Sequence, residues 1–281
     1  MKSLHYWRGR GYEELKDYSK AQADYATSIR FGPNYQPPYL RNADLLRNLK
    51  KYNEAIAAYD NTIKKFWSAA YADLAKMHYG RGRCYLALKD TVRAKSDFLF
   101  ATEYEYSHTG ANMELGRIAY AKKNYSNARI HFAYLNKTLD LDSATYSDVY
   151  FLKGMANREG GSTSYYTTAK TAFQESLNFN PRHAAARRYL ADVYFIESRF
   201  DLAETEITKC IDLYSKNKDS LINMYRYRMQ ARNQQKKYKE ALEDYDELNK
   251  LKPLTEPGDV KHMGQLAYEI QNFEKGGWHF Y

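Results

Sequence analysis

The chain opens with an arginine-glycine run beside a tryptophan, HYWRGRGYEELKD at residues 5–17. Such a run could contact nucleic-acid phosphates, or its glycines could let the backbone cradle a phosphate group. Residues 78–90, however, are HYGRGRCYLALKD, identical to the first stretch at nine of thirteen positions. The recurrence indicates a structural repeat unit. Within a helix the backbone amides are already hydrogen-bonded, so this run cannot cradle a phosphate.

The other residues suited to chemistry are seven histidines and two cysteines. None has the spacing of a zinc site, and neither HExxH, GxSxG, a phosphate loop nor a dinucleotide fingerprint occurs. Cys84 and Cys210 lie 126 residues apart, and we expect both to be buried free thiols. The sequence therefore predicts a non-enzymatic protein with no metal and no cofactor.

The elements that would carry a site are helices, because apolar residues recur at intervals of three and four and no sustained alternation indicates a strand. A common frame joins them. A small residue is followed by tyrosine three places later, alanine twelve places later, and an aromatic residue four places beyond the alanine. The clearest copies are Gly9, Tyr12, Ala21 and Tyr25, and Gly82, Tyr85, Ala94 and Phe98. Further alanines of the frame are Ala55, Ala128, Ala169, Ala203 and Ala241.

This frame resembles the tetratricopeptide repeat, a helix-turn-helix unit, over essentially the whole chain. The resemblance implies an all-α fold, a right-handed superhelical solenoid of antiparallel helix pairs, in which the small residues let two helices approach closely. We expect one solenoid over residues 1–281, belonging to a longer protein. Its repeats fall near 2–35, 36–70, 71–108, 109–143, 144–183, 184–217 and 218–255, with a partial eighth at 256–281.

The repeats alternate in length. Successive alanines of the frame are 34, 39, 34, 41, 34 and 38 residues apart, so the true period is two repeats. About four additional residues amount to one helical turn. We therefore predict a longer first helix in repeats three, five and seven, or a longer helix before it. The segment REGGSTSYY at 158–166 predicts an irregular exposed loop inside repeat five.

By the same resemblance, the first helices line a concave groove that binds a partner. Carried onto this sequence, the lining is rich in arginine and tyrosine, with Arg10, Arg83 and Arg117 as a recurring row. Guanidinium groups pair with carboxylates and rings bury area at low entropic cost, which suits an acidic peptide or protein segment. The predicted groove residues are Tyr6, Trp7, Arg10, Arg41, Lys76, Tyr79, Arg83, Arg117, Tyr120, Arg188, Tyr189, Arg226 and Tyr227.

The leading hypothesis is thus a scaffold or adaptor that binds a peptide or protein segment in a basic groove. A structural subunit of an envelope or secretion assembly, using its outer surface or ends, is the alternative. RNA binding is a minor one, because the net charge of +9 is spread without a basic block. No stretch is apolar enough to span a membrane. Oligomeric state stays open, as does the compartment: the cytoplasm, or the periplasm if a leader has been removed.

Overall fold

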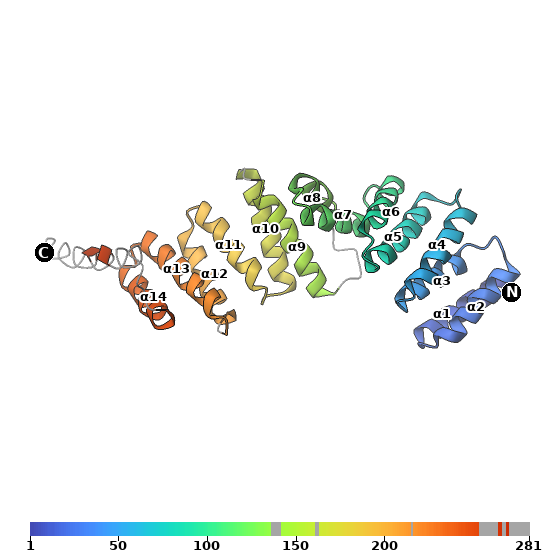
Figure 1. Cartoon of the computed structure of the whole chain (residues 1–281), viewed down its shortest axis with the longest axis horizontal. Helices are drawn as coiled ribbons and strands as arrows, with labels where there is room; N and C mark the ends of the chain where they lie inside the picture. The colour runs from blue at the N-terminus through green and yellow to red at the C-terminus, as the bar shows by residue number, and fades with distance from the viewer. Residues whose placement is uncertain (136–141, 161–162, 215, 253–263, 266–267, 270–281) are drawn as a thin grey trace. The chain divides into compact units, whose positions relative to one another are not determined.

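The computed structural model describes residues 1–135, 142–160, 163–214, 216–252, 264–265 and 268–269 (Figure 1). The described residues form helices α1 to α14 and contain no strand. The predicted all-α fold is confirmed. Backbone contacts divide the chain into unit 1, Met1–Asp140, and unit 2, Leu141–Tyr281. The partial eighth repeat lies mostly outside the described residues.

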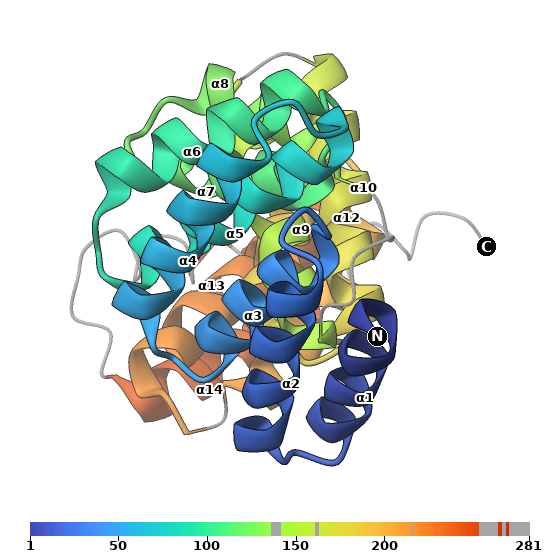
Figure 2. The same ribbon diagram turned by 90° about the vertical axis from the view of Figure 1, so that its right-hand side faces the viewer.

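Unit 1 consists of four helix pairs, and the second helix of each pair packs on the first helix of the next; Figure 2 shows α4 beside α5. Its helices are α1 (Lys2–Glu14), α2 (Tyr18–Phe31), α3 (Pro37–Asn48), α4 (Tyr52–Lys65), α5 (Tyr71–Ala87), α6 (Thr91–Tyr104), α7 (Thr109–Ala121) and α8 (Tyr125–Phe132).

Unit 2 contains three described helix pairs joined in the same way, with α10 contacting α11 and α12 contacting α13. Its helices are α9 (Ser143–Arg158), α10 (Thr163–Phe179), α11 (Ala184–Ile196), α12 (Phe200–Leu213), α13 (Lys218–Gln234) and α14 (Tyr238–Leu251). None of the helices described in either unit is long and apolar enough to cross a membrane.

Glycines let the two helices of a pair approach closely. A Cβ atom added to Gly82 in α5 would lie 2.7 Å from Cε1 of Phe98 in α6, so only glycine fits against this ring. Gly9 with Tyr25, Gly116 with Phe132 and Gly154 with Phe173 repeat this contact. The pairing of small residue and aromatic ring, expected from the sequence frame, is therefore the core contact of the helix pair.

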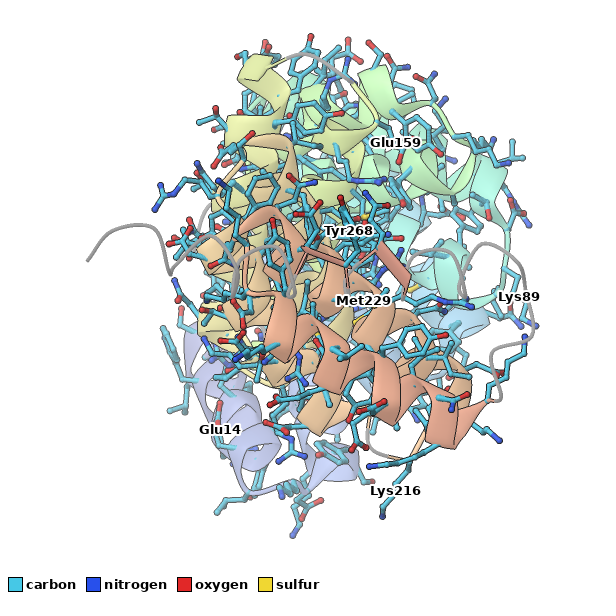
Figure 3. All side chains as sticks on the ribbon, turned by 90° about the vertical axis from the view of Figure 1, so that its left-hand side faces the viewer. Glu14, Lys89, Glu159, Lys216, Met229 and Tyr268 are labelled. Carbon is cyan, nitrogen blue, oxygen red and sulfur yellow. The ribbon has the colours of Figure 1, made fainter. Side chains whose placement is uncertain are left out.

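The turns between paired helices are short and share one geometry. Lys16, Lys50, Lys89, Lys123, Ser198 and Lys236 all have positive φ angles, and each stands two residues before a second helix. The left-handed residue reverses the chain within three residues, and Lys89 projects from the surface at its turn (Figure 3). The aromatic residues Tyr18, Tyr52, Tyr125, Phe200 and Tyr238 each begin a second helix.

The predicted alternation of helix length is confirmed. The first helices α5, α9 and α13 have 17, 16 and 17 residues, whereas α1, α3, α7 and α11 have 12 or 13. The predicted loop at 158–166 is wrong in extent. Arg158 ends α9 and α10 already begins at Thr163, so most of the inserted residues lengthen α10 instead of forming a loop.

Candidate functional site

Two carboxylates in unit 1 hold consecutive helices together along the predicted groove. Glu13 in α1 accepts hydrogen bonds from Nε of Arg41 in α3 at 2.9 Å and from the hydroxyl of Tyr25 at 2.7 Å. Asp44 in α3 accepts a hydrogen bond from the hydroxyl of Tyr59 at 2.6 Å. Arg41, predicted to bind a partner, is therefore already paired with a carboxylate of its own chain.

Further along unit 1, a buried carboxyl is under the electrostatic influence of two arginines of the predicted row. Glu114 in α7 is buried, and burial raises its pKa, although the charges of Arg117 and Arg83 oppose the shift. Nη1 of Arg83 donates to the hydroxyl of Tyr79 at 3.2 Å. Tyr79 itself packs against His108, with ring centroids 4.8 Å apart. This part of the groove is thus partly neutralised from within.

We expect Glu114→Gln to raise the free energy of unfolding near pH 7. Because the pKa of folded Glu114 lies above the unfolded value of about 4.3, ionising this carboxyl costs stability as the pH rises through that interval. Glutamine removes that cost and keeps the shape. Urea unfolding of both proteins should show the gain at neutral pH and none below the unfolded pKa. A loss of stability at neutral pH would mean that the carboxylate is needed for its pairing with the arginines.

The remaining predicted residues of unit 1 have separate surroundings. Nη2 of Arg10 lies 4.0 Å from Oε1 of Glu14, and Nζ of Lys76 lies 3.5 Å from Oδ1 of Asp73. The Tyr6 ring packs with its centroid 5.1 Å from that of Trp7. Trp7 is exposed, and Tyr120 packs against Tyr125 with centroids 5.5 Å apart.

In unit 2 the structure gathers residues from three first helices, among them the predicted Arg188, Tyr189 and Tyr227. The guanidinium carbons of Arg158 in α9 and Arg188 in α11 each lie 5.0 Å from the ring centroid of Tyr189. Nη2 of Arg158 also lies 3.5 Å from Oδ2 of the buried Asp192. The hydroxyl of Tyr227 in α13 donates a hydrogen bond to the Asp192 carboxylate. The pKa of Tyr227 is about 12, raised by burial and then by this hydrogen bond.

A cavity of about 400 Å³ lies beside this cluster. Arg188, Arg226 and Tyr227 line it, so three predicted residues meet around one space. The rest of the wall comes from Tyr214, directly after α12, and from four further residues of α13: Ser220, Asn223, Met224 and Gln230. The lining combines two cations, two tyrosines and several neutral hydrogen-bonding groups. Such a wall can hold an anionic group and the apolar part of the chain that carries it.

The sequence reasoning missed a second set of charged residues. Asp24 in α2 accepts two hydrogen bonds of 2.7 Å from Arg8 and lies 3.3 Å from Nδ1 of His5. Asp97 in α6 is held in the same way by Arg81 and His78. In unit 2, Arg228 pairs with Asp244 at 2.7 Å. These pairs fasten the first helix to the second, so one arginine of each RGRG run is structural.

A signal for these pairs was present. Histidine, arginine and aspartate stand at 5, 8 and 24 and again at 78, 81 and 97, which is the 73-residue period already found. The fifth repeat departs from it, with Lys153 and Ala172 at the positions of arginine and aspartate. The pairing of arginine with aspartate could have been predicted only from this recurrent spacing, because no single residue of the set indicates it.

The cysteines are buried free thiols, as predicted. Burial raises the pKa of Cys84 to about 11 and that of Cys210 to about 12, so neither is a thiolate at neutral pH. Among the residues described, no group of histidine, cysteine, aspartate and glutamate side chains could hold a metal ion.

Helix pairs that repeat a glycine-aromatic contact, with the second helix of one pair packed on the first helix of the next, define an α-helical repeat protein. A family model described as tetratricopeptide repeat matches residues 40–99 and 165–217, one region in each unit. These two regions therefore consist of tetratricopeptide repeats. Proteins of this kind generally act as scaffolds for protein or peptide partners.

Solved structures agree with this fold. The chain is similar to YrrB, a tetratricopeptide repeat protein with an unusual peptide-binding site, at 21% identity and a TM-score of 0.55, over 70% of this chain and 95% of YrrB. It is also similar to the C-terminal part of a tetratricopeptide repeat protein from Cytophaga hutchinsonii, at 17% identity and a TM-score of 0.56, over 91% and 98% of the two chains.

A third similar structure is a tetratricopeptide repeat protein from Parabacteroides merdae, at 17% identity and a TM-score of 0.51, over 94% of this chain and 98% of that one. Among curated proteins there was no significant match. At these identities the similarity shows the fold alone.

Proposed function

We propose that the chain is a non-enzymatic scaffold that binds an acidic peptide or protein segment on the first helices of unit 2. One observation carries the proposal: Arg188, Arg226 and Tyr227 line a single cavity. Arg188, which lines the cavity, and Arg158 also each lie 5.0 Å from the Tyr189 ring centroid. YrrB, which has a similar fold, has a peptide-binding site, and this precedent supports a peptide as the ligand.

The cavity suits a carboxylate side chain. Its volume of about 400 Å³ falls within the range of about 300–1,000 Å³ that is usual for ligand pockets. Arginine presents paired N–H donors to the two oxygens of a carboxylate, and tyrosine supplies ring area together with a hydroxyl group. Ser220, Asn223 and Gln230 can hydrogen-bond to the backbone of the same segment.

Unit 1 offers a second surface of weaker charge. Glu13 pairs with Arg41, and the buried Glu114 is under the electrostatic influence of Arg83 and Arg117. We propose that Tyr6, Arg10, Lys76, Tyr79 and Tyr120 contribute aromatic and polar contacts there, and that unit 2 supplies most of the electrostatic attraction. A partner bound to unit 1 alone should therefore depend less on salt concentration than one bound to unit 2.

The test is a peptide array graded in acidity and probed with the purified protein. Wild type should bind acidic segments that also carry an aromatic or aliphatic residue. The double variant Arg188→Gln/Arg226→Gln should lower the affinity for those segments by a factor of about 10 to about 100, because each substitution removes one charged hydrogen-bond donor to the acidic groups of the peptide. Fluorescence anisotropy with the strongest peptide gives the dissociation constants.

A matched control removes two arginines of unit 2 that lie outside the cavity. Arg182 and Arg199 are exposed, so Arg182→Gln/Arg199→Gln changes the net charge by the same amount. Its affinity should stay within about twofold of wild type. Equal losses in both double variants would reduce the effect to net charge, and the proposed site would be wrong.

A further inference from the structure

The first helix has a row of exposed apolar residues on one face. Leu4, Trp7, Gly11 and Leu15 follow one another at intervals of three, four and four, which keeps them on one side of a straight helix. Leu4 is 62% exposed, Trp7 64% and Leu15 78%, and Gly11 is exposed too. We call these four residues the α1 stripe.

Two residues of the α1 stripe, Leu4 and Gly11, correspond to positions that a later first helix buries. In the repeat frame Leu4 corresponds to Met77 and Met224, which are 0% and 2% exposed. Gly11 corresponds to Cys84, which is fully buried in a cluster with Ala43, Ala55 and Tyr59 of α3 and α4. The stripe therefore has the composition and position of a packing surface, and no described residue covers it.

Gly11 and Trp7 indicate what packs there. A Cβ at Gly11 would meet no atom within 4 Å, so the fold itself does not need this glycine, although glycine weakens a helix interior. Trp7 projects from the same face one turn earlier. If two α1 helices pack antiparallel, Trp7 of each copy lies opposite Gly11 of the other, and Leu4 opposite Leu15. The Trp7 side chain of one copy then occupies the space beside Gly11 of the other copy, where there is no side chain.

Charge favours antiparallel pairing of two α1 helices. Glu14, at the C-terminal end of α1, is exposed (Figure 3) and would face the positive N-terminal end of the second α1, where Lys2 lies.

We propose that the protein forms a two-fold symmetric dimer through the α1 stripe, with Trp7 of each copy seated on Gly11 of the other. A two-fold interface is self-complementary, and the two exchanged contacts, Trp7 with Gly11 and Leu4 with Leu15, satisfy that requirement.

Sedimentation equilibrium of the full chain from about 1 μM to about 1 mM should show a monomer-dimer equilibrium. Gly11→Leu should raise the dissociation constant at least about tenfold, because the new side chain fills the space that Trp7 would occupy, while the monomer has room for it. Trp7→Ala should weaken the dimer similarly. The double variant Trp7→Ala/Gly11→Leu exchanges the large and small residues and should regain much of the affinity, since the two positions face each other.

Val92 in α6 is 80% exposed and lies off the stripe, so Val92→Glu is the matched control and should leave the equilibrium unchanged. A monomer at every concentration would overturn the proposal. So would a dimer insensitive to Gly11→Leu, because that dimer would use another surface. Circular dichroism should find the helix content of all variants unchanged.

Discussion

Asp97→Ala is expected to lower the local stability of the α5–α6 pair by about 3 to 5 kcal/mol. Asp97 is almost fully buried and accepts hydrogen bonds from Arg81 at 2.6 and 2.9 Å and from the ring of His78 at 2.9 Å. Alanine leaves the guanidinium without its buried partner. Hydrogen exchange of the α5 and α6 amides measures the effect locally, because helical repeats can open separately.

Asp60→Ala is the control for this variant, because Asp60 binds the same guanidinium at 2.6 Å but its side chain is 50% exposed. The loss should be below about 1 kcal/mol. Burial raises the pKa of Asp97, but hydrogen bonds from Arg81 and His78 outweigh it and hold the pKa below its ordinary value. The stabilisation is therefore present above the unfolded pKa of about 3.9 and is lost as the pH falls through the folded pKa. Equal effects of the two variants would contradict this account.

Gly82→Val is expected to destabilise the same helix pair by about 2 to 3 kcal/mol. The new Cβ would lie 2.7 and 2.9 Å from two ring carbons of Phe98 and 3.1 Å from Cβ of Asp97. Phe98 is fully buried and cannot move aside without displacing its neighbours. Amide exchange in α5 and α6 should quicken accordingly.

Gly11→Val makes the identical substitution within a helix where the new Cβ meets nothing. Measured at a concentration low enough to keep the protein monomeric, it should leave stability unchanged or raise it slightly, because valine has the higher helix propensity by about 0.5 kcal/mol. If Gly82→Val is tolerated as well as Gly11→Val, close approach of the helices is not what the repeat glycines provide.

The architecture could be predicted because the same residue types recur at the same spacing in successive helix pairs. Gly82 and Phe98 stand sixteen residues apart, as do Gly9 and Tyr25, and each ring contacts its glycine. The two-repeat period also predicted the longer α5, α9 and α13. The segment after Arg158 was misjudged because glycine and serine favour loops locally, whereas helix α10, which packs against α9, begins at Thr163.

The candidate site was less predictable, because the role of an arginine depends on which carboxylate lies within reach. Arg41 and Arg188 were assigned to the groove alike, yet Glu13 pairs with Arg41, and Arg188 lines an open cavity. Arg8 and Arg10 lie in one RGRG run, but only Arg8 reaches Asp24 on the second helix. Side-chain direction and the distance between helices determine which carboxylate an arginine reaches, and residue spacing alone predicts neither of them.

The central claim is that an acidic segment binds unit 2 along α11 and α13. Hydrogen exchange with and without a saturating acidic peptide, chosen on the array, tests it most directly. We predict slower exchange of amides around Arg188–Asp192 and Asn223–Gln230, with little change in α12 and α14, and loss of this protection in Arg188→Gln/Arg226→Gln. Protection confined to α12 and α14, or retained in the double variant, would contradict the proposed site.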